Sequence, residues 1–99
     1  MSWASKYIEQ LKAGETVEFR PRGNSMTGRI ESGNLVKVVP VDRQLEKGDI
    51  VLCKVNGRQY LHLIKAISGD RIQISNNHGH INGWTSVSQI YGICVKVSK

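Results

Sequence analysis

An Asn56-Gly57 pair separates two runs of strand-forming residues, and it places the strongest constraint on how this chain can fold. Both residue types accept the positive φ angles of a tight two-residue turn, so the pair predicts a β-hairpin. The first strand of the hairpin is predicted over residues 49–55 and the second over residues 58–67. The two strands are therefore expected to pair with each other in antiparallel orientation.

Other short runs of alternating or β-branched residues, each ended by glycine, proline or a polar turn, predict further strands. They cover residues 16–20, 35–39, 71–75 and 90–97. Residues 76–84 are polar and contain glycine, which predicts a loop, and residues 85–89 are expected to form a single helical turn. No internal repeat, linker or low-complexity segment interrupts this order.

The first residues of the chain predict a short helix. Its apolar residues recur at helical spacing and form one stripe: Trp3, Tyr7, Ile8 and Leu11. Ser2 or Ser5 is expected to cap its start, and Ala13-Gly14 to end it. The fold class is therefore mainly β, a small curved sheet or partly open barrel of about six strands with a short N-terminal helix. We expect a single domain, with the helix in residues 1–14 and the β domain in residues 15–99.

Composition narrows the classes of protein. The chain has 99 residues and a formal charge of +6, but no two of its 14 basic residues are adjacent, so weak nucleic-acid binding is the most that the charge favours. Cys53 and Cys94 lie alone in apolar runs and are expected to be free, buried thiols, although a disulfide remains open. No signal peptide and no apolar run of about 20 residues is present, which predicts a cytoplasmic protein without a membrane segment. A phage or bacterial source is compatible with this small size.

The segment from Arg22 to Thr27 carries a candidate nucleophile, Ser25. A serine hydroxyl holds its proton too tightly at neutral pH to attack a carbonyl alone. It needs a tight turn that presents the oxygen, backbone N–H groups directed at the oxyanion, and a base within reach. Gly23 permits such a turn because it accepts positive φ without strain.

His62 is the candidate base. In the predicted strand over residues 58–67, both faces are largely apolar, so the imidazole is expected to lie among hydrophobic side chains. Burial lowers the pKa of a histidine and keeps the ring neutral, as a general base requires. The same spacing also fits a core histidine bonded to a backbone carbonyl, and spacing alone favours that alternative.

A family resemblance favours His62 as a general base over His62 as a core histidine. The pattern Gly23-Asn24-Ser25-Met26-Thr27, with Ile30 and Gly33-Asn34-Leu35-Val36 after it, resembles the nucleophile segment of the LexA and signal-peptidase superfamily. Gly48-Asp49-Ile50-Val51 is similar to the strand that follows it there. Tyr60-Leu61-His62-Leu63-Ile64 resembles the strand that carries the base, and His62 follows Ser25 by 37 positions, a spacing like that of LexA-type repressors. The resemblance covers about residues 16–97. Its segments occur in the same order as in the superfamily, including the segments near the C-terminal end.

This chain departs from the superfamily pattern at several positions. His62 stands where most members have lysine, although endoplasmic-reticulum and archaeal signal peptidases also use histidine. Asn76 stands where signal peptidases have an aspartate, so the carboxylate that would orient His62 is missing there. Gly23 offers no hydroxyl to an oxyanion. Two further replacements are Gly28 for a proline and Asn34 for an aspartate. Lys65 does not restore a lysine dyad, because it projects from the strand face opposite His62.

The resemblance implies a serine-endopeptidase-like protein with a Ser25–His62 dyad that acts on a peptide bond. Backbone N–H groups of Asn24 and Ser25 would form the oxyanion site, and peptide would dock as an added strand. The residues expected to contact the bound peptide are Met26, Asn76 and Asn77. No cofactor or metal is implied: His78-Gly79-His80 offers two ligand types but places no third.

Two alternatives remain open on the sequence. The first is a non-catalytic protein of the same fold that binds a protein or nucleic acid. The second concerns Ala13-Gly14, which is similar to the bond that LexA-type proteins cut in themselves. Only ten residues separate this bond from Ser25, so a helix end is favoured over a cleavage site. The oligomeric state is not predicted.

Overall fold

The structure, a computed structural model, describes residues 3–99 and consists of one helix and a seven-stranded antiparallel sheet. The elements in chain order are α1 (Ser5–Lys12), β1 (Val17–Phe19), β2 (Leu35–Pro40), β3 (Ile50–Val55), β4 (Arg58–Ser68), β5 (Arg71–Ser75), β6 (Ile81–Ser86), a 3₁₀ turn (Val87–Gln89) and β7 (Ile90–Ser98). No helix within residues 3–99 is long and apolar enough to span a bilayer.

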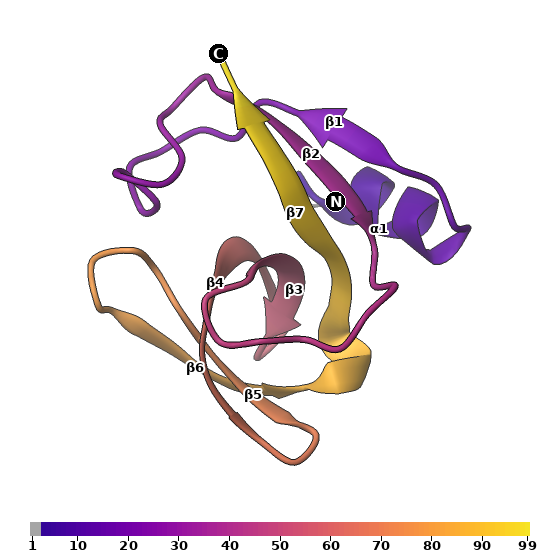
Figure 1. The fold of residues 1–99 in the computed structure, drawn as a ribbon, viewed down its shortest axis with the longest axis vertical. Coiled ribbons are helices and arrows are strands. Elements are labelled where there is room, and N and C mark those ends of the chain that lie inside the picture. Colours follow the sequence, from indigo (N-terminus) through magenta and orange to yellow (C-terminus); the bar gives the residue numbers. More distant parts are fainter. Residues whose placement is uncertain (1–2) are drawn as a thin grey trace.

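The sheet is curved and open. Its strand order is β1-β2-β7-β3-β4-β5-β6, so β1 and β6 form the two edges and do not pair with each other. Figure 1 shows the β1–β2–β7 part and the β4–β5–β6 part turned toward different sides of the molecule, with β3 between them. The prediction of a mainly β, partly open fold with a short N-terminal helix is confirmed.

The sheet has one strand more than the sequence analysis counted. Residues 76–84 were expected to form a loop, but β6 begins at Ile81 and pairs with β5 through Gln73↔Trp84 and Ile72↔Thr85. The prediction missed this strand because β6 alternates poorly and contains Gly83. The strand is held by backbone hydrogen bonds to β5, which do not depend on the side-chain pattern.

The predicted hairpin forms with its tight turn. Asn56 and Gly57 have φ angles of 50° and 80°, both in the left-handed region that a type I′ turn requires. The turn fixes the register of β3 and β4, which pair from Val55↔Arg58 through Val51↔His62. The position of His62 along the sheet is thus set by this turn.

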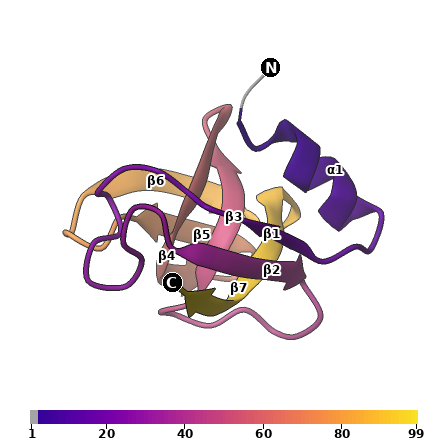
Figure 2. The ribbon, with the colours of Figure 1, turned by 90° about the horizontal axis from the view of Figure 1, so that it is seen from above.

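Two clusters of buried side chains lie on opposite faces of β3. Ile50 and Leu52 belong to the cluster that α1 covers, whereas Val51, Cys53 and Val55 belong to the other. Helix α1 lies over the β1–β2–β7 part of the sheet (Figure 2). Strand β3 has a buried cluster on each face, and Lys54 is its one residue that is not fully buried. Cys53 and Cys94 are free thiols, the first buried and the second half-buried.

Helix α1 buries Ile8 and Leu11 of the predicted stripe, whereas Trp3 precedes the helix and is 50% exposed. The helix begins without a side-chain cap bond. Ala4 occupies the N-cap position and makes no side-chain cap bond, and Ser2 lies outside the described residues. The helix ends as predicted. The N–H of Glu15 donates to the carbonyl of Gln10 and that of Gly14 to Leu11, and Gly14 has a φ of 86°. This Schellman arrangement makes Ala13-Gly14 a helix terminus.

Gly92 on β7 lies where strand β2 and helix α1 leave no room for a side chain. A Cβ added there would lie 2.7 Å from Val38 Cγ1, 2.8 Å from the Val39 carbonyl oxygen and 2.9 Å from Leu11 Cδ1. We therefore expect Gly92→Ala to destabilise the fold by about 1–3 kcal/mol through overpacking. Urea unfolding measures this loss. Val95→Thr, an exposed change on the same strand, should stay within about 0.5 kcal/mol of the wild type. Equal stability of the two variants would contradict this packing.

Candidate active site

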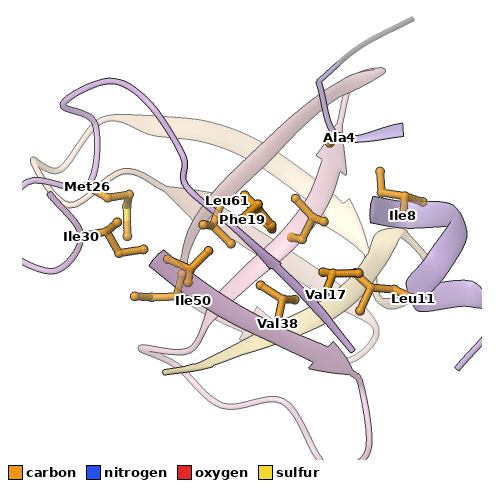
Figure 3. Packing of buried hydrophobic residues seen from close by; sticks show 12 residues of the cluster. Ala4, Ile8, Leu11, Val17, Phe19, Met26, Ile30, Val38, Ile50 and Leu61 are labelled. Carbon is orange, nitrogen blue, oxygen red and sulfur yellow. The ribbon is translucent and has the colours of Figure 1, made fainter. Parts of the chain in front are cut away.

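The candidate nucleophile lies on a turn that its neighbours hold in place. Ser25 is exposed, whereas the side chains of Met26 and Ile30 are buried in the same core cluster as Ile8 and Leu11 of α1, at its end away from the helix (Figure 3). The N–H groups of Arg29 and Ile30 both donate to the Met26 carbonyl, at 3.0 and 2.7 Å. Gly23, with a φ of 105°, lets the chain turn before the serine. Met26, expected to contact peptide, anchors the turn through its buried side chain and also lines the pocket described below.

Ser25 and His62 meet, although 37 positions separate them. The Ser25 Oγ lies 3.0 Å from His62 Nε2, within hydrogen-bond distance. His62 comes from β4, is 8% exposed, and stacks on the Tyr60 ring with 4.9 Å between ring centroids. The alternative of a core histidine bonded to a backbone carbonyl is not what the geometry shows. Lys65, the lysine nearest along the chain, is exposed.

The other ring nitrogen of His62 has a partner that the sequence analysis did not assign. His62 Nδ1 lies 2.7 Å from Asn82 Oδ1, on β6. An amide oxygen only accepts, so Nδ1 carries the proton and donates it to Asn82. Nε2 is then unprotonated and accepts the hydroxyl proton of Ser25. One contact thus selects the tautomer that a general base needs.

Burial sets the charge of this histidine. Desolvation is the largest influence and lowers the pKa of His62 below its ordinary 6.5. The hydrogen bond to Asn82 opposes this and raises the pKa, while the nearby His80 lowers it further by charge repulsion. Desolvation prevails, which favours the neutral form of the ring.

The loop between β5 and β6 clamps the serine turn. The backbone N–H of Asn77 donates to the Ser25 carbonyl at 2.9 Å, and its side-chain Nδ2 donates to the Thr27 carbonyl at 2.8 Å. His78 Nε2 lies 2.8 Å from the Asn24 carbonyl oxygen and donates to it, because a carbonyl oxygen only accepts. Three carbonyls of the turn are thus held by two neighbouring residues.

This clamp has a consequence for the N–H groups of the turn. In a trans peptide the C=O and the next N–H point in opposite directions. Fixing the carbonyls of Asn24 and Ser25 toward the clamp therefore directs the N–H groups of Ser25 and Met26 away from it. Within residues 3–99, the N–H groups of Asn24, Ser25 and Met26 make no hydrogen bond. They remain available to an oxyanion.

Asn76 supports the clamp from within its own loop. Its Oδ1 accepts the N–H groups of His78 at 2.8 Å and His80 at 2.9 Å, and its own N–H donates to the His80 carbonyl. Neither Asn76 nor Asn77, both expected to contact peptide, lines the pocket beside Ser25. In the described part of the chain, no group of three His, Cys, Asp or Glu side chains is placed to hold a metal ion.

An open pocket of about 330 Å³ adjoins Ser25 and His62. It lies between the segment before the serine and the first half of β4. Its lining consists of Trp3, Pro21, Arg22, Gly23, Ser25, Met26, Ile30, Gln59, Tyr60, Leu61 and His62. The serine and the histidine thus face a cavity rather than bulk solvent alone.

A curved, open antiparallel sheet that sets a serine turn beside the strand after a tight hairpin defines a class of small β proteins with a peptidase-like fold. Residues 2–86 match the sequence model of the family described as Peptidase S24-like, and the chain belongs to this family. The match confirms the resemblance to the LexA and signal-peptidase superfamily. A comparison with curated proteins finds no significant match.

The two neighbours of His62 predict shifts of opposite sign in its pKa. Asn82→Ala removes a hydrogen bond that favours the charged ring, so the pKa of His62 should fall further. His80→Gln removes a repelling charge, so the pKa should rise. Titration of the imidazole carbon-bound protons by NMR measures both shifts. Shifts of the same sign in the two variants would contradict the geometry described here.

Proposed function

We propose that this chain is a serine endopeptidase in which Ser25 is the nucleophile, His62 the general base and Asn82 the group that orients the base. The contact of 3.0 Å between Ser25 Oγ and His62 Nε2 is the observation that carries the proposal. Nucleophile, base and orienting group within hydrogen-bond reach are the signature of nucleophilic catalysis, and an amide serves as the third member in papain-like proteases.

The reaction follows from these contacts. Ser25 Oγ attacks the carbonyl carbon of the peptide bond while its proton passes to His62 Nε2. The oxyanion that forms is stabilised by backbone N–H groups of the turn. When the C–N bond breaks, His62 returns the proton to the leaving amine and an acyl-enzyme remains. Water then attacks the ester carbonyl and gives a proton to His62 Nε2. His62 passes this proton to Ser25 Oγ as the C–O ester bond breaks and the carboxylic acid leaves.

The first half of β4 offers a place for the peptide backbone. Strand β5 pairs with β4 only from Leu63 onward, whereas β3 pairs with it from Arg58. Ile64 exchanges hydrogen bonds with the β3 side, so by alternation the backbone groups of Gln59 and Leu61 face the edge that β5 leaves open. Because Gln59 and Leu61 also line the pocket, a peptide added along this edge would pass Ser25.

Removal of either Ser25 or His62 should slow cleavage strongly. We expect Ser25→Ala and His62→Ala to cleave a synthetic randomised decapeptide library at least about 10³-fold more slowly than the wild type. Mass spectrometry of new amino termini measures the rate. Lys65→Ala is the matched control and should remain active, because this lysine is exposed and outside the pocket.

The pH profile adds a second readout to this assay. Because burial lowers the pKa of His62 below 6.5, the rate should be level near pH 7 and fall only as the pH drops below 6.5. Cleavage that persists in Ser25→Ala would contradict the proposal. A folded wild-type chain that cleaves no peptide would also contradict it and favour the non-catalytic binding protein of the same fold.

The clamp predicts a role for His78 outside the pocket. His78→Ala removes the donor to the Asn24 carbonyl and should loosen the N–H groups of the turn. We expect kcat to fall about tenfold with KM unchanged, less than the 10²–10³ caused by deleting an oxyanion donor. The control at pH 8 is His80→Ala, on the same loop, whose side chain forms no hydrogen bond among the described residues. Equal kcat values for the two variants would exclude the clamp as a positioning device.

A further inference from the structure

The pocket beside Ser25 has an apolar floor. Met26, Ile30 and Leu61 form it, and each is at most 6% exposed. The rings of Trp3 and Tyr60 add apolar surface to the walls. These side chains come from the serine turn, from β4 and from the segment before α1, so the pocket is assembled from three separate parts of the chain.

The size of the pocket discriminates between small and large side chains. Its volume of about 330 Å³ lies at the lower end of the roughly 300–1,000 Å³ typical of small-ligand sites. A methyl side chain would leave most of the apolar wall without contacts. A large apolar or aromatic side chain would cover that wall and remove both surfaces from water.

The charge of the pocket excludes another class of side chain. Arg22 is its one charged lining residue unless His62 is protonated, and no carboxylate lines it. Within residues 3–99, Arg22 forms no salt bridge. A lysine or arginine side chain of a substrate would therefore lose water, find no acidic partner and meet a like charge.

Peptide geometry brings such a side chain to the pocket. In an extended peptide alternate side chains point to the same face. A peptide that pairs with the open edge at Gln59 and Leu61 would direct one of them toward Met26 and Ile30, close to the bond presented to Ser25.

We infer that this pocket selects peptides by one large apolar or aromatic side chain, that of Leu, Met, Phe, Tyr or Trp, in preference to alanine, lysine or arginine, next to the bond at Ser25. The inference rests on the proposed peptidase function and deepens it by naming a substrate class. It assigns Trp3 a role in specificity, as a wall that touches the substrate side chain and takes no part in proton transfer.

The test separates binding from cleavage. A synthetic randomised decapeptide library is selected for binding to immobilised Ser25→Ala, and the same library is digested by the wild-type chain. In both arms we expect large apolar residues at one position to be enriched at least about tenfold over alanine and over lysine or arginine.

Trp3 and Trp84 provide a matched pair for the pocket wall. Their exposed fractions are 50% and 39%, but only Trp3 lines the pocket. Trp3→Ala should reduce the enrichment severalfold, whereas Trp84→Ala should leave it unchanged. Circular dichroism checks that both variants remain folded.

The outcomes distinguish this inference from the proposed function. Cleavage without side-chain preference would overturn the inference and leave the peptidase proposal standing. Selective binding by Ser25→Ala without cleavage by the wild type would support the pocket assignment and contradict the peptidase proposal. The absence of both selective binding and cleavage would overturn both.

Discussion

The hydrogen bond between His62 Nδ1 and Asn82 Oδ1 is the contact on which the site depends. It fixes which ring nitrogen carries the proton and in which direction the other nitrogen points. Without it, a neutral imidazole beside Ser25 would have either tautomer available, and one of them would present an N–H instead of a lone pair. The contact also satisfies a buried polar group, since in the described chain no buried side-chain nitrogen or oxygen lacks a partner.

The sheet order explains how these groups come together. His62 is on β4 and Asn82 on β6, with β5 between them in the strand order. Strand β5 pairs with β4 only from Leu63 onward, so the two side chains meet where β5 ends. Ser25 arrives from the connection between β1 and β2, at the other end of the strand order. The loop between β5 and β6 joins the two ends by bonding the serine turn. The same loop that leads into the strand of Asn82 thus also bonds the turn that carries the candidate nucleophile.

The sequence predicted what depends on local pattern. Asn56-Gly57 predicted the hairpin, and Gly14 predicted the helix end, because a tight hairpin turn and a helix terminus both need positive φ angles that few residues accept. Family resemblance then singled out Ser25 and His62. Asn82 was not predicted, because its position depends on the pairing of β6 with β5, and neither alternation nor spacing of side chains indicates that strand. Its one signal was the density of hydrogen-bonding residues between 76 and 84, which does not say which amide turns toward the histidine.

In the proposed chemistry, the amide of Asn82 stands where many serine peptidases have a carboxylate, and this changes how the transition state is stabilised. A carboxylate would hold the tautomer and also attract the imidazolium that forms when Ser25 attacks. An amide holds the tautomer but offers that cation only a dipole, and desolvation already disfavours it, as the lowered pKa of His62 indicates. More of the stabilisation of the transition state must then come from the oxyanion side. The three bonds that Asn77 and His78 make to carbonyls of the serine turn are consistent with that division, since they hold its N–H groups in place before a substrate arrives.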